Sequence, residues 1–308
     1  MGSMPRIEPV PASETDRALS LLVGGRSDIR ARHALEAFAA LLHGPDLLRC
    51  DFRWARTLLG PRAAGLVVRN PGNTAMIFHT PADRADAGAL RRLLLELSDA
   101  TLSDGIISFV QALLEPDRPV DAAALSEAGF ERLTQLLYMT RLVSEAVEEP
   151  PQLELEWSQF ARGDERELGG VIADTYVDSL DCPRLRGKRQ LPDVIASHRG
   201  TGVYRPQSWW MPARGGERVG CVLVNGVPGE PAAAEIVYLG VRPAFRRRGL
   251  GRALIRHALA DAFARHVRHV HLAVDSANTP AAALYQSEGF VETHRRDVFV
   301  KCAPNLEN

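Results

Sequence analysis

The chain has 308 residues, of which 45% are hydrophobic and 24% are charged, and its formal net charge is −1. This length predicts about two domains. The balanced charge gives no general attraction to nucleic acid or anionic membranes, so a phosphate site would need a local cluster. No apolar run is long enough to cross a bilayer.

The first half alternates between helical and strand patterns. Residues 13–16 predict the N-cap region of a helix that runs through Leu22. Apolar residues at helical spacing predict further helices over residues 29–42, 86–97 and 122–128. Alternating or continuous apolar runs predict strands over residues 6–10, 51–57, 64–69, 74–80, 106–114 and 131–143. Asn70-Pro71-Gly72-Asn73 predicts a hairpin turn between two of these strands.

Glu148-Glu149-Pro150-Pro151 is the best linker, because two prolines resist helix and favour an extended path. We therefore expect domains at residues 1–147 and 153–308, with residues 148–152 between them. The second half predicts strands over residues 153–160, 208–212, 219–225, 233–241, 268–274 and 291–301. It predicts helices over residues 164–176, 249–265 and 279–288, and loops around a short helix over residues 181–206.

The two halves are similar at an offset of about 160 residues. Ala124-Leu125 with Gly129-Phe130 falls near Ala283-Leu284 with Gly289-Phe290, and strand 106–113 falls on residues 266–273. The first half therefore resembles a diverged copy of the second. Coincidence stays an alternative, because a Gly-Phe pair after a helix is common.

A basic turn, Arg246-Arg247-Arg248-Gly249-Leu250-Gly251, lies between a predicted strand and the predicted helix 249–265. A helix N-terminus offers unpaired N–H groups and a positive dipole end, both of which favour phosphate. The glycines allow close backbone approach, and the arginines add forked donors. A solvated basic turn is the alternative. The spacing is neither a dinucleotide fingerprint nor a P-loop.

Three motifs follow in order: a strand ending in Val241-Arg-Pro243, the sequence Arg-x-x-Gly-x-Gly, and Asn278 with Ala-Leu-Tyr285 and Gly289-Phe290. Together they resemble the Gcn5-related N-acetyltransferase (GNAT) superfamily. The resemblance implies an α/β (α+β) fold of two tandem domains, each a mixed, mostly antiparallel sheet flanked by helices. It also implies acyl transfer from an acyl-CoA, with acetyl-CoA as cosubstrate, to an amine.

The resemblance assigns the cofactor site residue by residue. The backbone amides of the basic turn would hold the pyrophosphate: Arg246, Arg247, Arg248, Gly249, Leu250 and Gly251. The main chain of Leu239, Gly240 and Val241 would pair with pantetheine as an added strand. Asn278 would contact pantetheine or order its loop. Tyr285 would protonate the departing CoA thiolate, or else be a half-buried helix aromatic.

Glu235 is the candidate general base, because one branch of the superfamily has a strand-borne glutamate at this place. An ammonium must lose a proton before it attacks a thioester, and a carboxylate on an apolar strand can have a raised pKa. Strand alternation should put Glu235 on one face with Val237, Leu239 and Val241, barring a bulge. An exposed strand-end carboxylate is the alternative, as is a base role for water or another carboxylate.

Other features are weaker. His269 and His271 share a strand face, a spacing that can bind metal, but no third ligand is apparent, so we expect no metal. Trp209 and Trp210 indicate either core packing or a wall of the acceptor pocket. Four well-separated cysteines without Cys-x-x-Cys spacing indicate free thiols in a reducing cytoplasm: Cys50, Cys182, Cys221 and Cys302.

The first half lacks the anion-binding chemistry. The turn at the start of its helix 86–97, Asp83-Arg84-Ala85-Asp86, has acids in place of the arginine run, and the tyrosine position falls on Leu125 or Ser126. Acids repel a pyrophosphate, so we expect a degenerate, non-catalytic domain over residues 1–147. This tandem organisation is similar to that of mycothiol synthases.

The expected activity is transfer of acetyl from acetyl-CoA to a primary amine of an unidentified acceptor by direct attack. Two alternatives are mycothiol-synthase-like acetylation of a small amine metabolite and a non-catalytic, CoA-binding regulatory role. The expected partners are acetyl-CoA and an amine, with no nucleic acid and no membrane. We expect a cytoplasmic monomer or homodimer.

Overall fold

The computed structural model describes residues 4–26, 28–145, 153–160, 164–185 and 187–304. The chain divides into two compact units, Met1–Leu133 with Asp297–Asn308 and Thr134–Arg296. The expected linker at residues 148–152 lies outside the described residues. These units differ from the expected division at 1–147 and 153–308, because residues 134–145 group with the second unit and residues 297–304 with the first.

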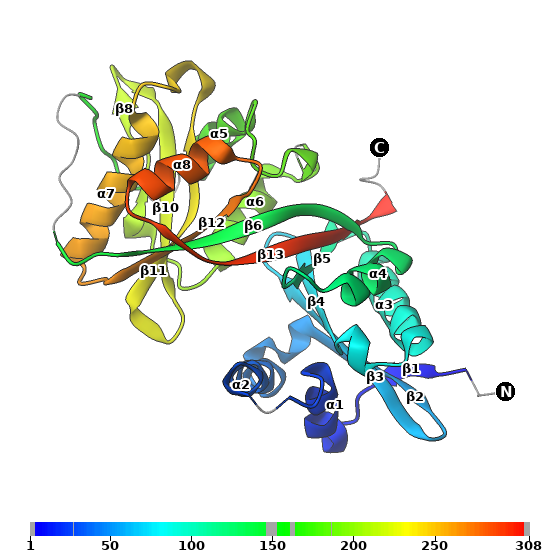
Figure 1. Ribbon diagram of the computed structural model, residues 1–308. Helices are drawn as coiled ribbons and strands as arrows, with labels where there is room; N and C mark the ends of the chain where they lie inside the picture. The colour runs from blue at the N-terminus through cyan, green and yellow to red at the C-terminus, as the bar shows by residue number, and fades with distance from the viewer. Residues whose placement is uncertain (1–3, 27, 146–152, 161–163, 186, 305–308) are drawn as a thin grey trace. The chain divides into compact units, whose positions relative to one another are not determined.

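The first unit is built on a sheet with helices on both faces (Figure 1). Its strands run in the order β1 (Arg6–Pro9), β2 (Cys50–Thr57), β3 (Gly60–Asn70), β4 (Thr74–His79), β5 (Phe109–Leu114) and the end of β13 (Val291–Cys302). Only the β4–β5 pair among these is parallel. Its helices are α1 (Thr15–Leu22), α2 (Ile29–His43), α3 (Ala87–Leu102) and α4 (Pro119–Glu127).

Strand β3 shows why both faces are covered. Alternate side chains of a strand point to opposite faces, and β3 is apolar at both sets of positions. Ala63 and Val67 pack against the leucines of α3. Leu66 and Val68 pack with α1 and α2 on the other face. A strand buried on both faces therefore has a continuous apolar sequence.

The second unit has the same layered plan. Its strands run in the order β6 (Glu131–Leu142), β12 (His269–Asp275), β11 (Glu230–Val241), β10 (Gly220–Val227) and β7 (Trp209–Trp210). The β11–β12 pair is parallel and the others are antiparallel. Helices α7 (Leu250–Ala264) and α8 (Thr279–Ser287) pack on one face. Helices α5 (Glu165–Tyr176) and α6 (Leu191–Gly200) pack on the other.

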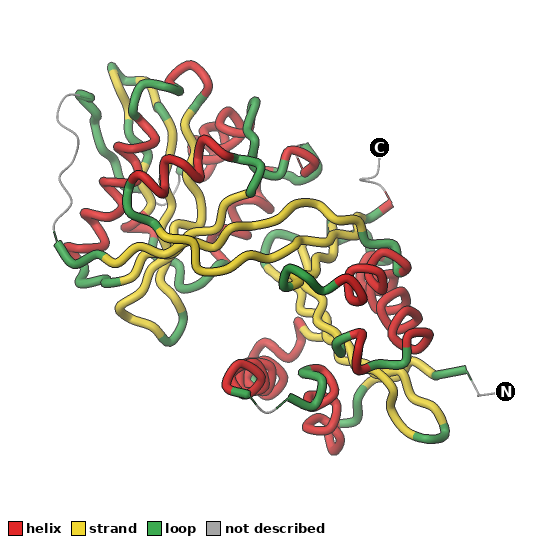
Figure 2. Tube along the Cα trace, viewed as in Figure 1, coloured by secondary structure: helices red, strands yellow, loops and turns green. Residues whose placement is uncertain are grey.

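Short elements complete the chain. A small hairpin joins β8 (Ala213–Arg214) and β9 (Glu217–Arg218). The 3₁₀ helices are η1 (Ala12–Glu14), η2 (Pro45–Arg49), η3 (Ala82–Arg84), η4 (Pro183–Leu185), η5 (Pro206–Ser208) and η6 (Pro243–Phe245). Figure 2 shows the helices, the strands and the loops that connect them.

Each unit is completed by a strand from the other half of the sequence. Residues Asp297 to Cys302 of β13 pair antiparallel with β5 of the first unit. Residues Leu136 to Leu142 of β6 pair antiparallel with β12 of the second. The apolar pattern predicts a strand at both places, but it does not predict which other strand each one pairs with.

The expected fold class and most elements are confirmed. Residues 153–160 are a correction: they contain only isolated bridges, Glu156↔Ala213 and Gln159↔Trp210. The strand expected at 208–212 shortens to β7, because η5 occupies Pro206–Ser208 just before it.

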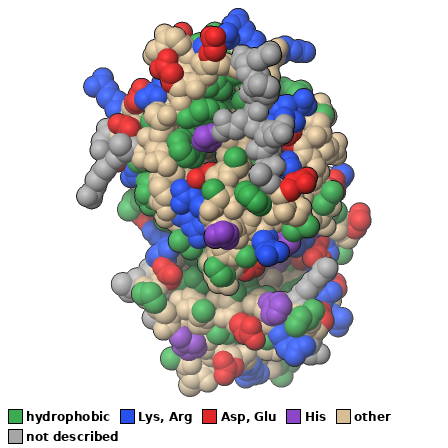
Figure 3. Space-filling view, turned by 90° about the vertical axis from the view of Figure 1, so that its left-hand side faces the viewer, with side chains coloured by type: hydrophobic (Ala, Val, Ile, Leu, Met, Phe, Trp, Pro, Cys, Tyr) green, Lys and Arg blue, Asp and Glu red, His purple; other side chains and the backbone are tan. Residues whose placement is uncertain are grey.

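The lengths of the helices and the charges on the surface can be compared with what the composition predicts. No helix in the described part of the chain is long and apolar enough to span a membrane. Basic and acidic side chains are intermixed on the face drawn in Figure 3, in keeping with the net charge of −1.

Candidate active site

The parallel strands β11 and β12 separate near their carboxyl ends. They pair from Ala233↔His269 to Ile236↔Leu272, and beyond this point β11 continues without β12 beside it. A cavity of about 720 Å³ lies between the parted ends, the start of α7, one side of α8 and the loop after α5. The main chain of β11 is therefore left open to a ligand along this edge.

A bulge in β11 lies at this point of separation. Val224 pairs with Ile236 and Leu223 pairs with Tyr238, so Val237 is an extra residue. A bulge bends a strand and changes the face of the residues that follow.

The bulge corrects the expected alternation along β11. Glu235 pairs with Asn225, whereas Leu239 pairs with Val222, and these two residues of β10 point to opposite faces. Glu235 therefore shares a face with Val237 but not with Leu239 or Val241, in contrast to the unbroken alternation that the sequence predicts.

The basic turn leads into α7. Gly249 precedes the helix with φ 79°, a left-handed conformation that favours glycine, and it has no side chain to cap the first N–H groups. Uncapped N–H groups and the positive end of a helix dipole are features that suit an anion. The Arg246 guanidinium instead donates to the carbonyls of Val241 at 3.0 Å, Thr175 at 2.9 Å and Val177 at 2.7 Å. It thereby holds the turn against α5 and β11.

The cavity brings together most of the predicted site residues. Those on its wall are Leu239, Gly240, Val241, Arg246, Arg247, Gly249, Leu250, Gly251, Asn278 and Tyr285. Two predicted residues, Glu235 and Arg248, are not among the described residues that line it.

Two of the predicted residues on this wall belong to α8 and its N-cap. Asn278 caps this helix, since its side-chain oxygen accepts from the Ala281 amide at 3.3 Å. Tyr285 is buried, with 8% of its surface exposed. Burial, with a smaller effect of the Asp181 charge, raises the pKa of Tyr285 above its usual value. The phenol is therefore protonated at neutral pH and able to donate a proton.

Glu235 lies at the start of the bulge. Its register partners are Asn225 on β10 and His271 on β12. Burial raises the pKa of Glu235, which suits a group that exchanges protons near neutral pH. Because it does not line the cavity, a proton would reach it through water.

A carboxylate pair that the sequence analysis missed holds the loop after α5. The buried Asp275 carboxylate accepts from the Thr134 hydroxyl at 2.6 Å, the Cys182 amide at 3.0 Å and the Ala277 amide at 2.9 Å. Asp181 in turn accepts from the Asp275 amide at 3.1 Å. Nothing in the spacing of these residues predicts the pairing, because it depends on a loop folding back onto the end of β12.

The other sequence candidates have structural roles. Trp209 is fully buried in the core beside α5 and α6, and its ring N–H donates to Asn225 at 2.9 Å. Trp210 packs edge-on to Trp157. His271 bonds to the Thr140 hydroxyl at 2.8 Å.

The first unit has a counterpart of this cleft. Strands β4 and β5 pair from Thr74↔Phe109 to Met76↔Gln111 and then separate, beside a cavity of about 400 Å³. The N-terminus of α3 differs from that of α7, because the Asp86 carboxylate accepts from the Ala89 amide at 2.8 Å. A fixed anion thus occupies the place where a phosphate would bind.

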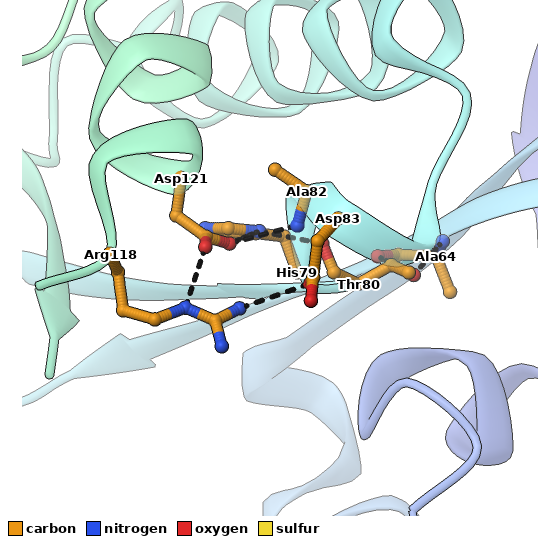
Figure 4. A network of polar contacts seen from close by, with 7 residues as sticks. All are labelled: Ala64, His79, Thr80, Ala82, Asp83, Arg118 and Asp121. Carbon is orange, nitrogen blue, oxygen red and sulfur yellow. Dashed lines mark hydrogen bonds and ion pairs between the residues drawn. The ribbon is translucent and has the colours of Figure 1, made fainter.

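Charged groups at this counterpart cleft neutralise one another (Figure 4). Arg118 donates to Asp121 at 2.8 Å and to Asp83 at 3.3 Å. Asp121 also accepts from the Ala82 amide at 2.9 Å. Burial lowers the pKa of the nearby His79, which donates from Nδ1 to the Thr80 carbonyl at 2.9 Å.

Comparison with known proteins agrees with this geometry. Residues 174–290 match the sequence model of the acetyltransferase (GNAT) family. The chain is 28% identical to mycothiol acetyltransferase of a Nocardioides species, over 92% of this chain and 97% of that protein. It is 29% identical to mycothiol acetyltransferase of Clavibacter michiganensis subsp. michiganensis, over 75% and 73%.

Solved structures share the fold. A GCN5-related N-acetyltransferase from Sphaerobacter thermophilus superposes with a TM-score of 0.66 at 18% identity, covering 98% of this chain and 97% of that one. A tandem GNAT protein from the clavulanic acid biosynthesis pathway superposes with a TM-score of 0.55 at 16% identity, covering 97% and 98%.

The matched residues 174–290 hold the parted parallel strands and the helix start that line the larger cavity. In sequence and in fold, the second unit is therefore similar to the GNAT acetyltransferases. The resemblance noted in the sequence is thereby confirmed.

Proposed function

We propose that the second unit transfers acetyl from acetyl-CoA to a primary amine of a small acceptor by direct attack, and that the first unit is not catalytic. The observation that carries this proposal is the cavity of about 720 Å³, whose wall includes the α7 turn, the bulge and Tyr285. A pyrophosphate site, an open strand edge and a proton donor therefore meet in one space.

The cofactor would bind through main-chain groups. The N–H groups at the start of α7 would hold the pyrophosphate, and the helix dipole favours its charge. The open edge of Leu239 to Val241 would pair with pantetheine as an added strand. Backbone N–H groups near Leu239 would polarise the thioester carbonyl and stabilise the oxyanion. Asn278 would order α8 at the same wall.

The chemistry would then follow from proximity. Binding holds the amine beside the thioester, and Glu235 takes the ammonium proton through water. The amine nitrogen bonds to the carbonyl carbon and releases its second proton to water, and the tetrahedral species collapses to the amide as the C–S bond breaks. Tyr285, whose phenol is protonated at neutral pH, gives its proton to the CoA thiolate.

One observation favours a narrower acceptor class. The likeness to mycothiol acetyltransferases extends over 92% of this chain, beyond the family domain. This likeness supports a small amine metabolite over a protein N-terminus as the acceptor of this chain.

Calorimetry and thiol release test the proposal. We expect acetyl-CoA to bind with one site per chain, and CoA to be released with at least one member of an amine panel. Tyr285→Phe should lower kcat by about 100-fold with unchanged acetyl-CoA affinity, because a general acid contributes about 10²–10⁴. Tyr204→Phe is the matched control, since Tyr204 packs against Trp209 instead.

Three results would contradict the proposal. Two sites per chain would show that the first unit also binds the cofactor. Binding without thiol release for any amine, with no effect of Tyr285→Phe, would indicate a CoA-binding regulatory protein. No binding heat at all would remove the cofactor site itself.

A further inference from the structure

A second cavity adjoins the cofactor cavity in the second unit. Its volume is about 430 Å³, and it lies among the loop after α5, helix α6 and the β11 bulge. Five residues line both cavities: Tyr176, Ser179, Asp181, Val237 and Tyr238. The two spaces therefore meet at the bulge, where a thioester held along β11 would lie.

The wall of this cavity is mainly apolar. Leu185, Leu191 and Val194 face it from the loop and from α6, and Val237 closes it at the bulge. Small-molecule sites are typically of this size, with apolar walls and a few polar groups that orient the ligand. The polar groups here are therefore informative about the occupant.

His198 supplies one polar group. Its Nε2 is buried, and in the described part of the chain it has no hydrogen-bond partner. The ring lies 5.0 Å from that of Tyr238, centroid to centroid. Burial, with a smaller effect of Arg189, lowers the pKa of His198 to about 4. A neutral, buried ring nitrogen is costly to leave without a hydrogen bond.

Two charged residues complete the polar set. Arg189 lines the same cavity, and its guanidinium donates to the Asp193 carbonyl at 3.0 Å and to the Ser197 hydroxyl. Asp181 lies where the two cavities meet, fixed by its bond to the Asp275 amide. A carboxylate at this junction attracts an ammonium toward the thioester.

We propose that this cavity binds the acceptor, a primary amine with a mostly apolar body and a hydroxyl group at its far end. The ammonium lies against Asp181, and the hydroxyl bonds to Nε2 of His198. A hydroxyl both donates and accepts, so it satisfies either tautomer of the neutral imidazole. This inference rests on the proposed acetyltransferase function and adds the substrate class.

Two amines that differ by one hydroxyl test the site. With saturating acetyl-CoA, we expect kcat/KM for tyramine to exceed that for phenethylamine by about 10-fold, because a buried partner rejects the analogue that lacks its hydrogen bond. His198→Phe should make the two values equal within about 2-fold. His198→Gln, which keeps a hydrogen-bonding end, should retain part of the preference.

Asp181 gives a separate readout. Asp181→Asn keeps an oxygen for the Asp275 amide but removes the charge, so KM should rise about 10-fold for both amines with their ratio unchanged. Asp174→Asn is the control. Asp174 lies on α5, forms an ion pair with Arg242, and is not among the described residues that line either cavity. Unchanged acetyl-CoA affinity by calorimetry shows that each variant is folded.

The inference is overturned by equal kcat/KM for the two amines, by a preference that survives in His198→Phe, or by better turnover of the polyol amine glucosamine. If acetyl-CoA binds but no amine releases thiol, the proposed function fails separately. Calorimetric titration of tyramine and of phenethylamine into the CoA-saturated protein then tests whether the second cavity binds the hydroxyl-bearing amine. Equal affinities for the two amines would reject the proposed acceptor pocket.

Discussion

At the scale of single residues, burial gives the site groups their chemistry. Tyr285 and Glu235 both have a raised pKa because the protein excludes water from them. For the phenol this keeps the proton on, as a general acid needs. For the carboxylate it raises proton affinity, as a general base needs.

Glu235→Gln tests the base. Burial raises the pKa of Glu235 above its usual value of 4.5. Its carboxyl group is therefore still protonated, and unable to act as a base, at pH values where an exposed glutamate is ionised. The acid limb of the kcat/KM profile should accordingly lie above pH 4.5. The variant should lose about 100-fold near pH 7. Activity should recover toward high pH, where the free amine needs no base.

Glu230→Gln is the control for this test, since Glu230 lies exposed at the start of the same strand. A pH profile of Glu235→Gln that parallels the unaltered protein at every pH would rule Glu235 out as the base.

At the scale of elements, backbone conformation prepares the cofactor site. The separation of β11 from β12 opens a strand edge, and the left-handed Gly249 presents the start of α7 without a cap. In the first unit the strands also separate, but Asp86 caps α3. The strands therefore part in both units, but the helix start is capped by a carboxylate in the first unit and uncapped in the second.

Gly249→Ala tests the turn. Alanine at φ 79° costs about 1–2 kcal/mol and displaces the amides at the helix start. We expect acetyl-CoA affinity by calorimetry to fall about 10-fold, because the anion site depends on those amides.

A matched glycine separates strain from function. Gly229 has φ 74°, and a Cβ there would contact nothing within 4 Å, as at Gly249. Gly229→Ala should lose similar stability and keep full acetyl-CoA affinity. Equal affinity losses in both variants would mean that general destabilisation explains the effect.

At the scale of the whole molecule, the exchange of strands links the stability of each unit to the other half of the sequence. Phe299, near the end of the chain, is 4% exposed and packs in the core of the first unit with α3. The last strand is thus part of a core whose other members, apart from Ala303, precede residue 134.

Phe299→Ala should therefore destabilise the first unit by about 3 kcal/mol through cavity formation. Hydrogen exchange should show faster exchange in α3, while acetyl-CoA affinity in the second unit stays the same. Val291→Ala, at a position 65% exposed on the same strand, should change exchange little. Loss of protection in α7 instead of α3 would contradict the assignment.

The amino-acid sequence was enough to predict the layered fold, the basic turn before α7 and the position of Tyr285 on α8. These depend on local signals: apolar periodicity, glycines at a helix start and a motif within a few tens of residues. Asn278 and Tyr285 could be placed because α8 fixes their spacing, whatever surrounds it.

Four features could be found only in the folded chain: the bulge at Val237, the Asp181–Asp275 pairing, the strand exchange and the second cavity. Each depends on contacts between residues far apart in the chain. A bulge is defined by its partner strand, and His198 becomes a buried polar group only when α6 packs on the sheet. Pairing energies between distant segments leave no trace in local periodicity, and so the cavity proposed for the acceptor could not be predicted from the sequence.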